Sequence, residues 1–371
     1  MRTVIPVENG DAQTAVQGFL RRLLEAGVVE AVLVAMETPA DAVTPALVTA
    51  PGLLDAAAPL APVMGLNAAR VVGHVSARTP RGRIAAVLRP CELRALVELV
   101  KVQQASLDDL LTVGVDCLGT YDVPAFNVLR ASEGGLDMPG LLGAAQTGDL
   151  APQDGFSFRD ACQMCEAPQV ERADIAFELF GADLAAGIPV SLPDEVADTL
   201  GLTAVEAGGE RHQVIAKVVA ARTATRDTRF AEIRQQLDEQ GIEGVFASCI
   251  RCHNCMTACP ICYCRTCLFK SPVFEHDPMQ YVAWARRKGA YRLPADTMLF
   301  HLTRLNHMAL SCIGCGMCTS ACPADLPVGR VFRAIGSQVQ ATFEYVPGRD
   351  VAEPLPLVTF REDEWQEVGE E

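Results

Sequence analysis

Eight cysteines in the last third of the chain form two copies of one spacing. The copies are Cys249-x2-Cys252-x2-Cys255-x3-Cys259-Pro260 and Cys312-x2-Cys315-x2-Cys318-x3-Cys322-Pro323. In this pattern three closely spaced thiolates hold one [4Fe-4S] cluster, and the fourth, followed by Pro, reaches the other cluster. The spacing therefore predicts two four-cysteine ligand sets, Cys249, Cys252, Cys255 and Cys322, and Cys312, Cys315, Cys318 and Cys259. Such clusters exchange single electrons, so the sequence indicates electron transfer.

Two other uses of clustered cysteines fit this sequence less well. Structural zinc sites take two Cys-x-x-Cys pairs a dozen or more residues apart, whereas here three ligands fall within one short run. Disulfide frameworks belong to small secreted chains, but this chain has 371 residues and an odd number of cysteines, 15. Its N-terminus lacks the basic head and apolar core of a signal peptide. We therefore expect reduced thiols and a cytoplasmic protein.

The charge and hydropathy patterns narrow the range of partners. The formal net charge of −15 disfavours binding to nucleic acid and to anionic membrane surfaces. The longest apolar runs, such as Val28–Met36, are too short to span a bilayer. Apolar residues make up 50% of the chain and charged residues 21%, which is typical of a folded protein with a sizeable core.

Four more cysteines precede the ferredoxin pattern: Cys91, Cys117, Cys162 and Cys165. Cys91 and Cys117 each follow a predicted strand, and the carboxyl ends of parallel strands are where α/β sheets bind cofactors. Cys162 and Cys165 form a Cys-x-x-Cys pair in a predicted loop, which is an unusual place for a core cysteine. The four thiols are candidate ligands of a third cluster, and buried packing cysteines are the alternative.

Three cysteines remain, directly after the first motif: Cys262, Cys264 and Cys267. Three thiolates alone do not complete a site with four ligands. The sequence leaves three uses open, which are exchange with the neighbouring cluster ligands, metal binding together with a residue of a partner, and simple packing.

The elements expected to position these cysteines alternate between helix and strand. Apolar periodicity predicts helices over Thr14–Ala26 and Glu92–Gln104, and strands over Val28–Met36, Arg83–Leu88 and Leu111–Val115. This order predicts an α/β domain with a mainly parallel sheet. The stretch Ala131–Phe158, rich in Gly, Asp and Pro, is expected to be a loop or an insertion.

The pattern divides the chain into three predicted regions. Residues 1–240 form the α/β domain, and the charged stretch Thr223–Gln240 is a helix that leads out of it. Residues 241–335 form a two-cluster ferredoxin-type domain, expanded by a helical insertion over Met279–Lys288 and Ala295–Leu310. Residues 336–371 form an extended acidic arm, either solvated or bound to a partner subunit. No G-x-G-x-x-G, P-loop, H-E-x-x-H or G-x-S-x-G motif supports a nucleotide fingerprint or a hydrolase.

The motifs outside the ferredoxin pattern resemble those of the coenzyme F420 hydrogenase and formate dehydrogenase beta subunits. They are Pro90-Cys91 before a basic helix, the strand end Gly114–Gly119, and Cys162 and Cys165 followed by Ala173-Asp174-Ile175. The ferredoxin part looks most like the formate dehydrogenase branch. The resemblance covers about residues 89–181 and 245–331.

This resemblance implies a flavin-binding first domain. Subunits of this family bind FAD beside a [4Fe-4S] cluster and exchange hydride with coenzyme F420, a deazaflavin, and the implied cluster ligands here are Cys91, Cys117, Cys162 and Cys165. A flavin converts a two-electron hydride into single electrons, so it links a hydride carrier to the clusters. NAD(P)H is the alternative carrier.

Basic and polar residues near these motifs are candidate FAD contacts: Arg89, Arg94, Lys101, Thr120 and Tyr121. For the three basic residues, ordinary surface charge is the alternative. His253 lies inside a cluster loop and is expected to tune a cluster's potential, whereas His301 and His307 are expected to be structural.

Three functions follow as hypotheses. The leading one is an FAD and iron-sulfur oxidoreductase subunit that links F420 or NAD(P) to a partner catalytic subunit of formate dehydrogenase or hydrogenase type, together with any further iron-sulfur subunits. No molybdenum, tungsten or nickel site is recognisable, so the partner would act on formate or H2. The alternatives are a stand-alone ferredoxin-dependent flavin reductase of a small organic substrate and a flavin-free polyferredoxin.

Overall fold

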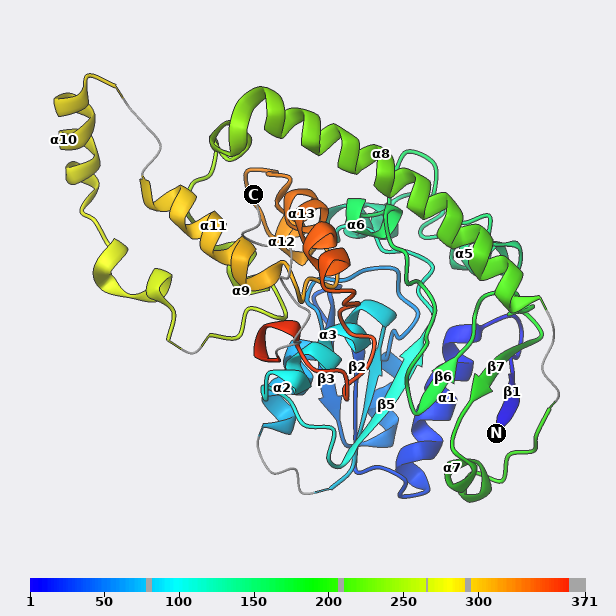
Figure 1. Cartoon of the computed structure of the whole chain (residues 1–371). Coiled ribbons are helices and arrows are strands. Elements are labelled where there is room, and N and C mark those ends of the chain that lie inside the picture. The colour runs from blue at the N-terminus through cyan, green and yellow to red at the C-terminus, as the bar shows by residue number, and fades with distance from the viewer. Residues whose placement is uncertain (78–81, 206–209, 265, 291–294, 360–371) are drawn as a thin grey trace.

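One mixed sheet organises the first part of the chain in the computed structural model, which describes all residues except 78–81, 206–209, 265, 291–294 and 360–371 (Figure 1). Among the described residues the strand order is β1-β7-β6-β5-β4-β2-β3. The strands are β1 (Arg2–Pro6), β2 (Ala31–Glu37), β3 (Val43–Val48), β4 (Ile84–Leu88), β5 (Leu110–Val115), β6 (Ile175–Phe177) and β7 (Gly187–Ser191). The run β2-β4-β5-β6 is parallel, and β3 and β7 pair with its ends in antiparallel fashion.

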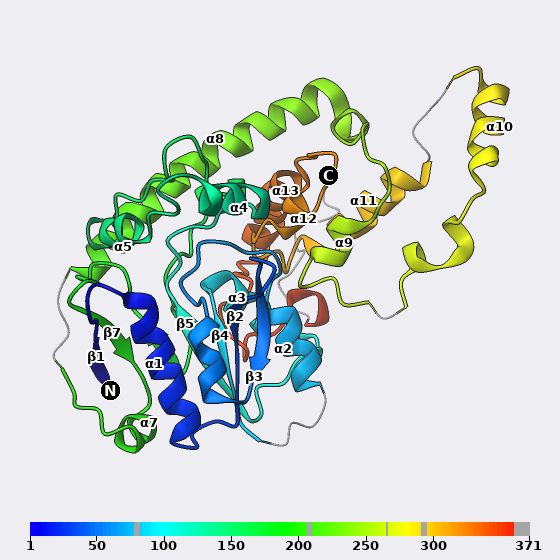
Figure 2. The same cartoon turned by 180° about the vertical axis from the view of Figure 1, so that it is seen from behind.

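Helices cover both faces of this sheet, as the alternation of side chains along a strand requires. In β2, Val32 lies in the core with α1 (Ala12–Glu25), whereas Leu33 lies in a separate core with α2 (Ala69–Ser76) and α3 (Pro90–Lys101). The two views show α1 on one face and α2 and α3 on the other (Figures 1 and 2). The prediction of an N-terminal α/β domain is confirmed.

The stretch 131–158, predicted to be a loop or an insertion, is not a plain loop, because it contains α5 (Met138–Thr147). The Asp137 carboxylate accepts a hydrogen bond from the Gly140 amide at 2.8 Å, which caps the helix start. Gly148, with φ of 76°, ends the helix in the left-handed conformation that glycine allows. The prediction treated Gly, Asp and Pro as residues that interrupt helices, whereas here Asp137 and Gly148 cap the two ends of a helix.

A single helix, α8 (Arg211–Val245), runs past both parts of the chain (Figure 1). Val214 and Val218 belong to the core of the α/β domain, whereas Phe230 and Ile233 belong to the core of the ferredoxin part. The helix kinks at Gly241, whose φ of 67° is non-helical. The boundary predicted near residue 240 therefore falls inside α8, close to the kink, rather than in a linker.

Short helices build the ferredoxin part. They are α9 (Asn254–Ala258), η2 (Leu268–Lys270), η3 (Pro272–Phe274), α10 (Pro278–Lys288), α11 (Ala295–Met308), α12 (Met317–Ser320) and α13 (Val328–Thr342). Both views show α10 projecting away from the body of the molecule (Figures 1 and 2). In the part of the chain that the structure describes, no helix combines the length and the apolar character needed to cross a membrane.

The C-terminal arm differs from the prediction of an extended segment from residue 336. Helix α13 continues to Thr342, because its apolar face is needed in the core of the ferredoxin part. Beyond it, the buried Tyr345 donates its hydroxyl hydrogen bond to Glu98 on α3 at 2.6 Å, and the Gly348 amide donates to the same carboxylate at 2.8 Å. The arm thus packs on its own chain up to this point. The acidic stretch 361–371 lies outside the described residues.

The remaining short elements connect these parts. They are η1 (Pro51–Ala56), α4 (Val123–Ala131), α6 (Asp160–Gln163), α7 (Asp194–Thr199) and η4 (Pro356–Val358).

Candidate functional site

Twelve of the cysteines gather in three groups of four. We name them the first-domain group (Cys91, Cys117, Cys162 and Cys165), the central group (Cys259, Cys312, Cys315 and Cys318) and the outer group (Cys249, Cys252, Cys255 and Cys322). Each group combines the four cysteines that the spacing or the resemblance puts together. Their role as cluster ligands stays a prediction.

All four cysteines of the central group line one cavity, although Cys259 comes from the first motif and the other three from the second. Burial raises the pKa of Cys315 to about 12, and the neighbouring Cys259 adds to this rise. Iron-sulfur clusters are held by four cysteine thiolates that converge on one site, as the side chains of these four cysteines do here. The donors present therefore fit a [4Fe-4S] cluster.

The outer group lies one helical turn from the central group. Helix α9 contains Cys255 of the outer group and is followed by Cys259 of the central group. Helix α12 contains Cys318 of the central group and is followed, two residues after its end, by Cys322 of the outer group. Each short helix therefore supplies one thiol to each group. Burial raises the pKa of Cys255 to about 11, and Cys249, Cys322 and Cys252 add to this rise.

The first-domain group lies at the carboxyl edge of the sheet. Cys91 is in the first turn of α3, directly after β4, and Cys117 follows β5. Burial raises the pKa of Cys117 to about 12, with a further contribution from Cys162 on α6. The pKa of Cys91 is also raised, first by burial and then by neighbours that include Cys315 of the central group. The first-domain group therefore adjoins the central group.

A buried carboxylate that the sequence reading did not single out fixes this edge. Asp116, 3% exposed, accepts hydrogen bonds from the amides of Val170 and Leu179, each at 2.8 Å, and forms an ion pair with Arg211 of α8. These contacts tie the chain after the Cys-x-x-Cys pair to the end of β5. The available signal was an acidic residue directly before Cys117 at a strand end.

The five candidate FAD contacts have partners within the chain. The Arg89 guanidinium donates to the carbonyls of Ala61 and Val63, and Arg94 donates to that of Pro347. Lys101 donates to the Tyr345 hydroxyl at 2.9 Å.

The two polar candidates are nearly inaccessible. Thr120 is 1% exposed and its hydroxyl lies 3.1 Å from Cys162 Sγ, and the Tyr121 hydroxyl accepts a hydrogen bond from the Gln153 amide. The FAD assignment of all five residues stays a prediction. For Lys101 and Tyr121 the structure supplies a structural role.

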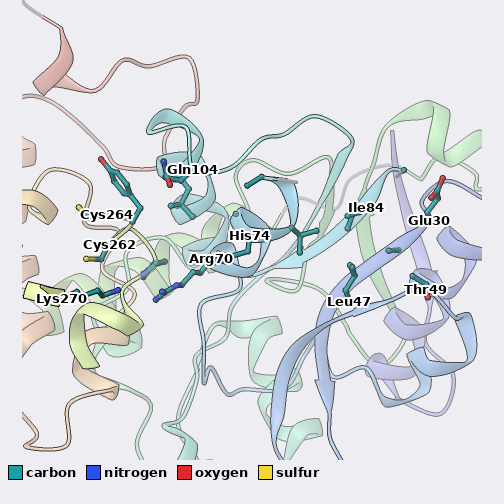
Figure 3. Close-up of a pocket in the computed structure, with 18 residues that line it drawn as sticks. Glu30, Leu47, Thr49, Arg70, His74, Ile84, Gln104, Cys262, Cys264 and Lys270 are labelled. Atoms are coloured by element: carbon teal, nitrogen blue, oxygen red, sulfur yellow. The ribbon is translucent and has the colours of Figure 1, made fainter. Parts of the chain in front are cut away.

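A pocket of about 1000 Å³ lies between the α/β domain and the loop after the first motif (Figure 3). Its lining includes Glu30, Leu47, Thr49, Arg70, His74, Ile84, Gln104, Cys262, Cys264 and Lys270. Glu30 and Ile84 lie at the amino ends of β2 and β4, opposite the edge that carries Cys91 and Cys117. Pro260, next to Cys259 of the central group, also lines the pocket.

The use of the three further cysteines, Cys262, Cys264 and Cys267, stays open. Burial raises the pKa of Cys262 to about 11, with contributions from Cys259, Cys264 and Cys267. No group of three His, Cys, Asp or Glu residues within the described ranges is arranged to hold a single metal ion.

Two histidines lie beside cluster loops. His301 is 1% exposed, stacks on Phe246, and its Nε2 lies 3.3 Å from Cys249 Sγ, so it contacts a candidate ligand as well as the core. Burial lowers the pKa of His301 to about 4, which keeps the ring neutral near pH 7. His253 stacks on Phe300 at 4.3 Å.

Comparison with known proteins supports an iron-sulfur domain in the C-terminal part of the chain. Residues 245–326 match the model of the 4Fe-4S dicluster domain. A beta subunit of F420-dependent formate dehydrogenase 1 from Methanococcus maripaludis is 25% identical and is matched over 95% of this chain and 94% of its own. The beta subunit of F420-dependent formate dehydrogenase from Methanocaldococcus jannaschii is 24% identical over 73% of this chain and 75% of its own.

These relatives confirm the predicted resemblance to the coenzyme F420 hydrogenase and formate dehydrogenase beta subunits. The chain is an oxidoreductase, and its C-terminal part is a dicluster iron-sulfur domain. A chain of the F420-reducing [NiFe] hydrogenase complex of Methanosarcina barkeri, 11% identical, aligns with a TM-score of 0.41 over 62% of this chain and 92% of its own.

Proposed function

We propose that this chain is the electron-transfer subunit that connects a hydride carrier to a separate catalytic subunit of formate dehydrogenase type. The observation that carries the proposal is the contiguity of three four-thiol groups. The first-domain group adjoins the central group through Cys91 and Cys315, and α9 and α12 join the central group to the outer group. Three [4Fe-4S] clusters held by these groups would form a path for single electrons through the chain.

The relatives support F420 as the carrier, because both are beta subunits of F420-dependent formate dehydrogenases. Since the beta subunit is one part of such an enzyme, a catalytic partner subunit is part of the proposal. A bound FAD would convert the hydride into single electrons. NAD(P)H is the competing carrier and belongs in the same assay.

We place the flavin in the pocket of Figure 3. A volume of about 1000 Å³ is within the range of cofactor pockets. Arg70 and Lys270 can pair with the pyrophosphate, since guanidinium and ammonium groups are common phosphate partners. Pro260 and Cys262 connect the pocket to the central group.

The flavin placement has a direct test. The double variant Arg70→Gln and Lys270→Gln should retain less FAD after purification, as measured by the flavin released on boiling. The control is Lys217→Gln, which changes an exposed lysine of α8 that pairs with Asp149. This variant should keep the wild-type FAD content. Full FAD content in the double variant would remove the flavin from this pocket. A wild-type protein that neither contains nor takes up FAD would favour the polyferredoxin.

The relay itself is tested with Cys315→Ala in the intact complex. Reduced F420 or NAD(P)H should still bleach the flavin, because the flavin site does not use this thiol. Electron delivery to the partner's substrate should collapse, because the central cluster lies between the other two. Cys267→Ala, outside the three groups, should retain turnover. Full carrier-to-partner turnover in Cys315→Ala would overturn the proposal, and turnover on a small substrate without any partner would favour the stand-alone flavin reductase.

A further inference from the structure

Arg304, on α11, lies buried between the central and outer groups. Its side chain donates hydrogen bonds to Cys255 Sγ at 3.1 Å and to the Cys255 carbonyl at 3.0 Å. The residue is 3% exposed, and its guanidinium packs over the ring of Phe332 at 4.9 Å. Arg304 also lines the cavity that holds the four central thiols, and its Nε is buried without a hydrogen-bond partner.

The charge of Arg304 has no carboxylate partner among the described residues, in contrast to most arginines around it. Arg330 donates to both oxygens of Asp160, and Arg333 pairs with Glu166. A buried guanidinium without a carboxylate is costly unless another negative group compensates it. The groups that surround Arg304 are thiols of the central and outer groups, namely Cys255, Cys259 and Cys318.

Arg159 occupies the corresponding place between the first-domain and central groups. It is 2% exposed and donates to the Cys315 carbonyl and to the Ser320 hydroxyl, each at 2.9 Å. It also reaches Thr120 Oγ1 at 3.5 Å, and that hydroxyl lies 3.1 Å from Cys162 Sγ. Its carboxylate contact, Asp122 at 3.6 Å, is half-exposed, so solvent weakens the compensation.

We propose that Arg304 and Arg159 are potential-setting residues, each placing one buried positive charge at a junction between two neighbouring clusters. The inference rests on the clusters of the proposed function. Reduction adds one electron to a cluster, and a nearby buried cation stabilises the added charge, which raises the reduction potential. Because the central group has such an arginine on both sides, its cluster is favoured as the electron acceptor from either neighbour.

The test is a redox titration of each cluster, followed by electron paramagnetic resonance, on the full chain purified without oxygen. Arg304→Gln should lower the potentials of the outer and central clusters and leave the first-domain cluster unchanged. Arg159→Gln should lower those of the first-domain and central clusters and leave the outer one unchanged. We expect at least a tenfold loss in each affected reduction equilibrium, which is about 59 mV for one electron. Cys165→Ser identifies the first-domain signal by its loss.

Two matched variants separate charge from packing. Arg304→Lys keeps the charge and should keep the outer and central potentials within tenfold of the wild type. Arg21→Gln removes an arginine on α1, paired with Asp55, and should change no potential. Unchanged potentials in both glutamine variants would overturn the inference. If Arg304→Gln and Arg304→Lys lose iron equally, Arg304 acts by packing and the inference is also wrong.

Failure of the proposed function would look different. A wild-type chain without three clusters, as measured by iron and acid-labile sulfide, contradicts the relay itself. A wild-type chain with all three clusters and unshifted variant potentials contradicts only the role of the two arginines.

Discussion

The two halves of the molecule assemble their thiols in different ways. In the ferredoxin half, each motif places three cysteines within a few residues, and α9 and α12 carry the fourth to the neighbouring group. In the α/β half, the four thiols come from the first turn of α3, the end of β5 and the loop around α6. The first arrangement is a property of local spacing, whereas the second exists only because parallel strands bring their ends to one edge.

This difference has an energetic consequence. A local motif depends on the conformation of a short loop. The first-domain group depends on long-range contacts, such as those of Asp116 with Val170, Leu179 and Arg211. We therefore expect the first-domain group to be more sensitive to mutations distant from its cysteines than the ferredoxin half is.

The largest effect should come from removing a ligand in each half in turn. Cys165→Ser should lower the iron content from about twelve to about eight atoms per chain, because one of three four-iron clusters is lost. Cys255→Ser should instead affect the outer cluster and leave the first-domain signal intact. Iron and sulfide assays with spectroscopy check both. An unchanged iron content in Cys165→Ser would show that the third cluster is not held by the first-domain group.

The next largest effect should come from removing the buried carboxylate of Asp116 in the α/β half. Asp116→Ala should destabilise this half by about 2–4 kcal/mol, because the amides of Val170 and Leu179 lose their acceptor, whereas Arg211 keeps Glu178 as a partner. It should also release the chain after the Cys-x-x-Cys pair and lower occupancy of the third cluster, while the dicluster signals persist. Chemical denaturation and cluster spectroscopy measure the two consequences. Asp149→Ala, which removes an exposed partner of Lys217, is the control and should leave the unfolding midpoint unchanged.

A smaller effect should appear where the halves touch. Gly316 has φ of 69°, and a Cβ there would lie 2.3 Å from the Cβ of Ala161 on α6. Gly316→Ala should cost about 1–2 kcal/mol for the left-handed backbone, plus the cost of moving α6 away from the central group. Gly201→Ala is the matched control, since Gly201 has φ of 61° and open space around it. Equal destabilisation of the two variants would show that the close approach to α6 is unimportant.

The smallest effect on the free energy of unfolding should come from removing the N-terminal cap of α1, which lies far from both cluster regions. The Asp11 carboxylate accepts hydrogen bonds from the Thr14 amide at 3.0 Å and from its hydroxyl at 2.7 Å, and these bonds lower the pKa of Asp11. Asp11→Ala should cost about 1 kcal/mol at pH 7. Because the folded-state pKa is depressed, this contribution is present above the unfolded pKa of about 3.9 and is lost as the pH falls through the folded value.

Unfolding of Asp11→Ala and wild type should be compared at pH 7 and at pH 3. The difference between the two proteins should shrink at the lower pH, and a difference that persists there would contradict the role of the ionised carboxylate. Neither protein should differ in its cluster signals at pH 7.

The sequence alone determined the features that depend on local order. The repeated cysteine spacing indicated the dicluster domain, and the alternation of apolar runs in residues 14–115 predicted the α/β domain and its parallel strands. Both signals are short in sequence, because a cluster loop and a buried strand are each specified by a few neighbouring residues. The strands β1, β3, β6 and β7 and the helix α5 were not predicted, because strands and helices this short carry weak periodicity.

Only the tertiary structure decided how the groups meet. Arg159 and Arg304 look like ordinary basic residues in the sequence, yet folding buries each of them between two thiol groups. The sequence also did not indicate that the C-terminal segment returns to α3, where Tyr345 becomes a partner of Lys101. These roles depend on contacts between segments far apart in the chain, and a linear pattern does not record which distant residue will compensate a buried charge.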